Sequence, residues 1–154
     1  MPKEIERKFL LKNDNWRSQF ISRTIIKQGY LSTQKERTVR VRILGDKGYL
    51  TIKGETIGMT RLEFEYEIPV QEAKELLQLC EKPLIEKERF IVSMGKLEWE
   101  IDIFEGDNEG LELAEVELED EKQVVEIPDW VGEEVTFDNR YFNSSLVKLP
   151  FRNW

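Results

Sequence analysis

The feature that most constrains the fold is an alternation of charged and apolar residues, which recurs in seven of eight short segments of the 154-residue chain. Successive side chains of an extended strand point to opposite faces. The clearest example places Arg61, Glu63, Glu65 and Glu67 on one face and Leu62, Phe64, Tyr66 and Ile68 on the other. Eight short strands joined by short turns predict an antiparallel sheet. Closing that sheet into a barrel would remove its exposed edges.

The predicted strands cover about residues 4–11, 23–31, 38–43, 49–53, 61–68, 86–93, 97–103 and 114–119. Helices are expected at 16–20, at 70–80, where apolar residues recur at helical spacing, and at 120–126. An acidic turn should follow Trp130, and Ser144 is a candidate cap for a short closing helix. No repeat or linker-like segment interrupts the pattern. We therefore expect one domain over residues 1–154, with an α+β fold in which helices pack outside an eight-stranded antiparallel closed barrel.

Two arrangements satisfy the alternation. The apolar rows could fill the barrel while the charged rows face water, or helices could cover the apolar rows while the charged rows line a tunnel. The charges segregate by sign, since 38–43, 49–53 and 86–93 are basic whereas 97–103 and 114–119 are acidic. Like charges in close rows repel by about 1 kcal/mol per pair even in water. The pattern favours the charged tunnel, in which carboxylates attract divalent cations and the bases attract a phosphate chain.

Composition narrows the chemistry further. The net charge of −8 argues against a broad nucleic-acid footprint. Because the chain has no histidine, a bound metal would have oxygen ligands, which suit Mg²⁺, Mn²⁺ or Ca²⁺. The single cysteine, Cys80, excludes an internal disulfide. No apolar run approaches a membrane span and no leader precedes the first strand, so we expect a cytoplasmic protein with no membrane partner.

Seven segments, in order, resemble the CYTH superfamily, the triphosphate tunnel metalloenzymes. The first is the opening Glu4-x-Glu6-x-Lys8, whose three side chains share one strand face. The others are Arg40-x-Arg42, Thr51-Ile52-Lys53, Arg61-x-Glu63-x-Glu65-x-Glu67, Lys87-x-Arg89, Trp99-Glu100-Ile101-Asp102 with Ala114-Glu115-Val116-Glu117, and Arg140-Tyr141-x-Asn143-Ser144. The resemblance covers nearly the whole chain and implies a tunnel that binds a triphosphate end-on with one or two Mg²⁺ or Mn²⁺ ions.

The resemblance also implies roles for individual residues. The candidate metal ligands are Glu4, Glu6, Glu63, Glu65, Asp102, Glu115 and Glu117. The candidate phosphate ligands are Lys8, Arg40, Arg42, Lys53, Lys87, Arg89 and Arg140, and the candidate catalytic residues are Glu4, Glu6, Lys8, Glu65 and Glu117. For Arg61 two roles stay open, namely pairing with a carboxylate and binding phosphate. For Tyr30 two roles also stay open, namely lining the tunnel and packing as a buried structural residue.

The function that this resemblance implies is metal-dependent hydrolysis of a triphosphate, with inorganic tripolyphosphate preferred over an organic triphosphate. Metal-activated water would attack inside the charged tunnel and release pyrophosphate and phosphate. The alternatives are an adenylyl cyclase, a thiamine or nucleoside triphosphatase of the same fold, and a non-catalytic polyphosphate-binding protein. We expect no nucleic-acid partner, and a homodimer is left open.

Overall fold

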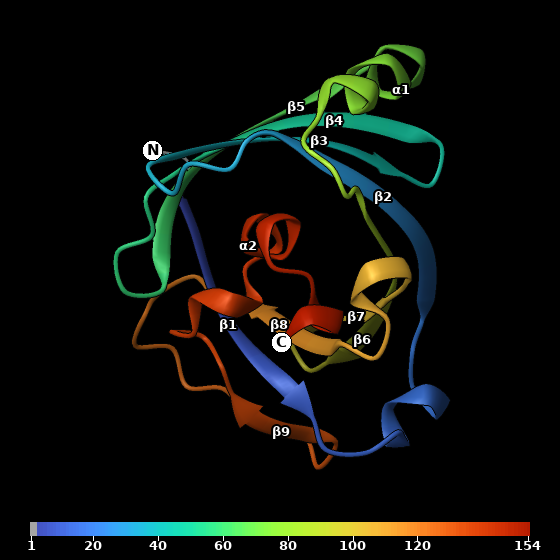
Figure 1. Cartoon of the computed structure of the whole chain (residues 1–154). Coiled ribbons are helices and arrows are strands. Elements are labelled where there is room, and N and C mark those ends of the chain that lie inside the picture. The colour runs from blue at the N-terminus through green and yellow to red at the C-terminus, as the bar shows by residue number, and fades with distance from the viewer. Residues whose placement is uncertain (1–2) are drawn as a thin grey trace.

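A computed structural model describes residues 3–154, and its strands form a closed ring (Figure 1). The strands are β1 (Lys3–Leu11), β2 (Ser22–Ser32), β3 (Arg37–Leu44), β4 (Lys47–Gly54), β5 (Thr60–Ile68), β6 (Ile85–Met94), β7 (Leu97–Phe104), β8 (Glu112–Glu117) and β9 (Val131–Glu134). The helices are α1 (Val70–Leu79) and α2 (Asn143–Lys148), with 3₁₀ turns η1 (Asn15–Ser18), η2 (Gly106–Asn108), η3 (Asn139–Tyr141) and η4 (Phe151–Asn153). No helix within this part of the chain has the length and apolar character to cross a membrane.

The sheet runs in the order β5-β4-β3-β2-β6-β7-β8-β1, and pairing of β5 with β1 closes it. Every pairing is antiparallel. Two-residue turns join β3 to β4 and β6 to β7, and each has a glycine at positive φ, Gly45 and Gly95. Such turns match the right-handed twist of the strands that they connect. The predicted eight-stranded antiparallel barrel is therefore confirmed.

Apolar packing outside the barrel follows the predicted faces. Trp99 of β7 is fully buried and packs with Phe9, Trp16 and Trp130. On another side, α1 covers the sheet with the apolar stripe that its sequence predicts, and Cys80 joins this core. The cover is incomplete, because Tyr66 on the outer face of β5 remains 56% exposed. Helical cover of the apolar outer face therefore does not extend over Tyr66 of β5.

Two predicted elements differ from the structure. The helix expected at 120–126 is absent, and Val124 is 92% exposed. The Asp120 side chain accepts a hydrogen bond from the Lys122 backbone N–H, and Asp120 and Gln123 close a turn. Such local bonds compete with a helix. The segment expected as an acidic turn after Trp130 forms β9, which pairs with β1 at Phe9 and Leu11.

Helix α2 has a different place from the one that the sequence suggests. Figure 1 shows it within the ring of strands, where Leu146 and Val147 are buried. They pack against Ile85 and Leu113, which share the inward faces of Lys87 and Glu115. One end of the barrel interior is thus filled by an apolar plug. Helix α2 begins at Asn143, so Ser144 is its second residue and not its cap.

Candidate active site

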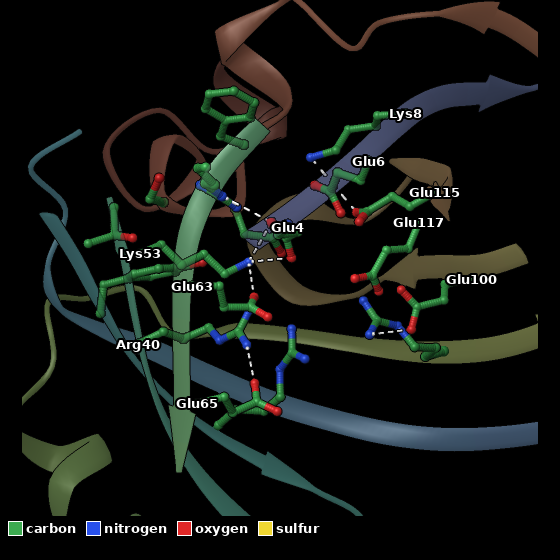
Figure 2. A pocket seen from close by; sticks show the side chains of 18 of the residues that line it. Glu4, Glu6, Lys8, Arg40, Lys53, Glu63, Glu65, Glu100, Glu115 and Glu117 are labelled. Carbon is green, nitrogen blue, oxygen red and sulfur yellow. Dashed lines mark hydrogen bonds and ion pairs between the residues drawn. The ribbon is translucent and has the colours of Figure 1, made fainter. Parts of the chain in front are cut away.

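The charged faces of the strands enclose a cavity of about 180 Å³ inside the barrel (Figure 2). The cavity is lined by Glu4, Glu6, Lys8, Tyr30, Thr38, Arg40, Arg42, Lys53, Arg61, Glu63, Glu65, Lys87, Arg89, Glu100, Glu115, Glu117, Phe142, Asn143 and Ser144. Seven of these residues are acidic and seven are basic. The predicted charged tunnel interior is therefore present.

The order of strands gathers these charges into two walls. Strands β4, β3, β2 and β6 are neighbours, and they contribute a basic wall of Lys53, Arg40, Arg42, Lys87 and Arg89. Strands β7, β8, β1 and β5 are also contiguous around the closed barrel, and they contribute all seven carboxylates. Lys8 and Arg61 are the two bases within this acidic wall. A ligand in the cavity therefore meets cations on one side and carboxylates on the other.

Two arginines of β3 form the centre of the basic wall. Arg40 is 7% exposed, and its Nε is a buried donor with no hydrogen-bond partner in residues 3–154. Its Nη2 donates to Thr51 Oγ1 and lies 3.3 Å from Glu65 Oε2. Arg42 is equally buried and makes no ion pair within the same range; its Nε donates to Gln28 Oε1 at 2.8 Å. Burial, assisted by the charges of Arg40 and Arg89, lowers the pKa of Arg42 to about 9. A buried cation without an ion pair, such as Arg42, and an unpartnered buried donor, such as Arg40 Nε, call for an anion.

Asp102 lies behind the cavity wall and does not line the cavity. It is 1% exposed and accepts hydrogen bonds from Arg89 Nε at 2.8 Å and Arg89 Nη2 at 2.9 Å. Lys87 Nζ approaches it to 2.7 Å. Burial works to raise the pKa of Asp102, but these two bases hold it well below its usual range. The structure therefore makes Asp102 a counterion for two candidate phosphate ligands, and it does not bring this predicted metal ligand to the cavity.

Carboxylates of β1 and β5 share the next group of bases. Lys53 Nζ lies 3.0 Å from Glu4 Oε2 and 3.1 Å from Glu63 Oε2, and Arg61 Nε donates to Glu4 Oε1 at 3.0 Å. Although burial opposes it, the Lys53 ammonium and the Arg61 guanidinium hold the pKa of Glu4 well below its usual range. Arg61 thus pairs with a carboxylate and lines the cavity as well.

Glu6 and Glu117 stand opposite each other on β1 and β8, and neither is ion-paired within the described residues. Burial, followed by the charges of Glu115 and Glu4, raises the pKa of Glu6 well above its usual range. Glu115 lies 3.8 Å from Lys8 Nζ. Burial works to raise its pKa, but the surrounding bases, led by Lys8, lower that pKa to about 2. Figure 2 shows Glu6, Glu115, Glu117 and Glu100 gathered on one side of the cavity.

The donor chemistry of this wall fits a hard divalent cation. Carboxylate oxygens are the ligands that Mg²⁺ and Mn²⁺ prefer. Burial, followed by the charges of neighbouring carboxylates, raises the pKa values of Glu6 and Glu117, and a cation would favour their ionised forms. Within residues 3–154, however, no three acidic or sulfur ligands converge into a ready-made site. This geometry suits Mg²⁺, which proteins commonly hold through one or two carboxylates together with substrate phosphates and water.

Several lining residues were not assigned by the sequence. Glu100, which precedes Asp102 by two residues and shares its face of β7, lines the cavity, whereas Asp102 does not. The C-terminal segment adds Phe142, Asn143 and Ser144, and Lys8 Nζ donates to the Tyr141 carbonyl at 3.0 Å. Tyr30 also lines the cavity. The two-residue alternation of β7 predicts that Glu100 faces the cavity. No periodic pattern predicts this for the residues of the C-terminal segment.

Arg140 is the one predicted phosphate ligand that the structure does not bring to the cavity. Its side chain is 55% exposed and pairs with Asp138 at 2.7 Å. Its guanidinium also stacks on Trp154. An exposed base that already has a carboxylate partner contributes little to a buried anion site.

A closed antiparallel barrel with a basic and an acidic wall inside defines a tunnel protein that holds a polyanion and a cation together. The CYTH domain family model matches residues 2–150, and the chain belongs to this family. It is 52% identical over 155 positions to an inorganic triphosphatase of Acetivibrio thermocellus, covering 100% of this chain and 99% of that protein. It is 37% identical over 149 positions to an inorganic triphosphatase of Nitrosomonas europaea, covering 94% and 96%.

Solved structures show the same architecture. A crystal structure of an inorganic triphosphatase superposes with a TM-score of 0.66 at 33% identity, covering 96% of this chain and 95% of that one. A putative adenylyl cyclase from Hippeastrum, described as having a dominant triphosphatase activity, superposes with a TM-score of 0.57 at 14% identity, covering 78% of this chain and 80% of that one. At that identity the second match establishes the shared fold alone.

Proposed function

We propose that this protein is a metal-dependent inorganic triphosphatase that hydrolyses tripolyphosphate to pyrophosphate and phosphate. The observation that carries the proposal is the pair of buried arginines on β3. Arg40 has an unpartnered buried Nε, and Arg42 has no carboxylate partner within residues 3–154. Both face a cavity in which 14 of the 19 lining residues are charged, which favours a compact polyanion over a large organic group. The activity of the relatives from Acetivibrio thermocellus and Nitrosomonas europaea supports the same assignment.

In this proposal the basic wall binds the phosphate chain. Arg40, Arg42 and Lys53 would contact phosphate oxygens from one side, and Lys87 and Arg89 from the adjoining strand. Charge-assisted hydrogen bonds from guanidinium groups to phosphate are short and directional. Phosphoryl transfer needs little covalent help from the protein, since positioning and charge neutralisation account for most of the catalysis. Lys8, within the acidic wall, would add a positive charge to phosphate oxygens from that side of the cavity.

The acidic wall would hold Mg²⁺ or Mn²⁺ and handle the proton. When bound, a divalent cation held by one or two of the carboxylates Glu4, Glu6, Glu63, Glu65, Glu115 and Glu117, together with phosphate oxygens, would neutralise phosphate charge and lower the pKa of a bound water. A carboxylate must accept the proton of the attacking water. Whichever of Glu6 and Glu117 does not hold the cation is available for this, because neither is ion-paired in residues 3–154. The water oxygen bonds to the terminal phosphorus, the bridging P–O bond breaks, and pyrophosphate leaves.

A turnover screen tests the assignment. Phosphate release from tripolyphosphate, ATP and thiamine triphosphate is measured with Mg²⁺ and with Mn²⁺, and the products from ATP are identified by chromatography. We expect tripolyphosphate to be hydrolysed fastest. Equal or faster turnover of ATP would contradict the substrate assignment, and formation of cyclic AMP would identify a cyclase. Tight binding of tripolyphosphate without turnover would identify a binding protein.

Two variants test the acidic wall. Glu6→Gln keeps the size of the side chain and removes the charge, so metal-dependent turnover should fall by at least about 100-fold, as expected for general-base or metal-ligand loss. Glu98→Gln is a matched control, since Glu98 is exposed on β7 and does not line this cavity. Unchanged turnover by the Glu6→Gln protein would refute the proposed role of β1.

A further inference from the structure

Asn143 is one of the five neutral residues among the 19 that line the cavity. It is the first residue of α2 and lines the cavity between β2 and β6. Strand alternation cannot signal it, since it lies outside every strand. Its side-chain carboxamide has one acceptor oxygen and one donor nitrogen, so the direction in which that group points decides what it can bind.

The orientation of Asn143 is fixed by a chain of groups that starts at Arg42. A guanidinium can only donate, so the Gln28 oxygen must face Arg42 Nε, and the distance is 2.8 Å. The nitrogen of the fully buried Gln28 is then directed to Asn143 Oδ1 at 3.2 Å. Lys87 Nζ, which also can only donate, approaches the same oxygen to 3.0 Å. Two donors therefore hold Asn143 Oδ1 against the wall of the barrel.

This arrangement leaves the amide nitrogen of Asn143 available. Nδ2 makes no hydrogen bond to any residue between 3 and 154, although the side chain borders the cavity beside Lys87. A neutral N–H among cations matches only an acceptor, and the acceptors in a triphosphate are its phosphate oxygens. A carboxylate could not replace it, because two carboxylate oxygens only accept when ionised.

We propose that Asn143 is a substrate-binding residue whose Nδ2 donates to a phosphate oxygen, and that Gln28 is the positioning residue that keeps it turned that way. The proposal rests on the triphosphatase function proposed above. It extends the phosphate-binding set from the strands to the C-terminal segment. The C-terminal segment that fills one end of the barrel would thereby also contact the substrate.

The opposing explanation is that Asn143 only tethers α2 and Lys87 to the barrel. In that case its oxygen is the sole functional atom, and Asn143→Asp should retain the role because an aspartate offers the same oxygen to Lys87 and Gln28. If Nδ2 contacts phosphate, the same variant replaces a donor by an acceptor that repels the substrate. Asn143→Ala removes both atoms and serves as the reference.

The experiment measures kcat/KM for tripolyphosphate with Mg²⁺, together with the melting temperature of each free protein. We expect Asn143→Ala and Asn143→Asp each to lose roughly 10- to 100-fold in kcat/KM, the range expected for one hydrogen bond to a charged group. The Asn143→Asp protein should melt at or above the wild-type temperature. Asn153→Asp is the charge control, because Asn153 is exposed on the same C-terminal segment, and it should retain wild-type kcat/KM.

The outcomes separate this inference from the proposed function. If wild-type protein does not turn over tripolyphosphate, the proposed function fails and this inference with it. If wild-type protein is active and Asn143→Asp stays within about twofold of it, the donor role is overturned and only the tether remains. A comparable loss in Asn153→Asp would also overturn it, since added charge alone would then explain the effect.

Discussion

Replacing Asp102 by asparagine tests the part of the site where the structure and the sequence disagree. Asp102 accepts hydrogen bonds from two nitrogens of Arg89 and lies 2.7 Å from Lys87 Nζ, with only 1% of its surface exposed. Asparagine has nearly the same size but carries no charge. Asp102→Asn would therefore leave two buried bases without the counterion that they share, while the shape of the wall is preserved.

The expected cost follows from the burial of this cluster. Removing one partner of a buried ion pair typically destabilises a protein by about 3–5 kcal/mol. Burial already lowers the pKa of Lys87 to about 7 with Asp102 present. Loss of the carboxylate lowers this pKa further, so Lys87 becomes neutral and part of the cost is relieved. We expect about 3 kcal/mol, which corresponds to a fall of roughly 6–12 °C in the melting temperature of a chain of this size.

The assay is urea unfolding in buffer without divalent cations, with turnover of tripolyphosphate measured in parallel. Glu98→Gln, on the same strand but exposed, should unfold within about 0.5 kcal/mol of the wild-type protein. A metal ligand without a structural role would show the opposite pattern. If Asp102→Asn unfolds like wild type without metal yet loses metal-dependent turnover, the counterion role is wrong and Asp102 binds the cation.

Three further predictions concern the C-terminal segment and the edge of the barrel. Arg140→Ala should change the KM for tripolyphosphate by less than about threefold, since Arg140 is exposed and paired with Asp138; a tenfold rise would place it over the substrate. Leu146→Ala should lower the free energy of unfolding by about 2–5 kcal/mol because Leu146 is fully buried in the plug, and a loss below 1 kcal/mol in urea unfolding would show that α2 does not depend on it. The hydrogen bonds from Arg7 lower the pKa of Glu134 below its ordinary 4.5, so the stability that Glu134 contributes is present above that pH and is lost as the pH falls below it. The difference in melting temperature between wild type and Glu134→Gln should therefore narrow between pH 6 and pH 3, and a constant difference would contradict this assignment.

Strand parity predicted most of the strand side chains that face the cavity. Side chains alternate with a strict period of two, so Glu4, Glu6 and Lys8 share one face of β1. The sign of the charges on each strand indicated which faces line the same cavity. The alternation does not predict which residues of one strand face reach the cavity and which lie beyond it. Glu100 and Asp102 share a face of β7, yet only Glu100 reaches the cavity, because Asp102 is drawn into the pair with Lys87 and Arg89.

The sequence could not predict what depends on contacts between distant segments. The two walls arise because β2 pairs with both β3 and β6, which joins the basic strands across a gap of 40 residues in the chain. Helix α2 has a short sequence with no distinctive stripe, and its place inside the barrel depends on the apolar ends of β6, β7 and β8. The roles of Gln28 and Asn143 follow from that placement.

The charge balance of the cavity couples the two ligands that it is proposed to hold. A phosphate chain that binds Lys53, Arg40 and Lys8 competes with the carboxylates that hold these bases at 3.0, 3.3 and 3.8 Å. The released carboxylates would then be buried without a partner, which is costly. A divalent cation on the acidic wall removes that cost, and since coupling between two ligands is reciprocal, each should raise the affinity for the other by the same factor. The requirement for metal would then begin at substrate binding, before any bond is broken.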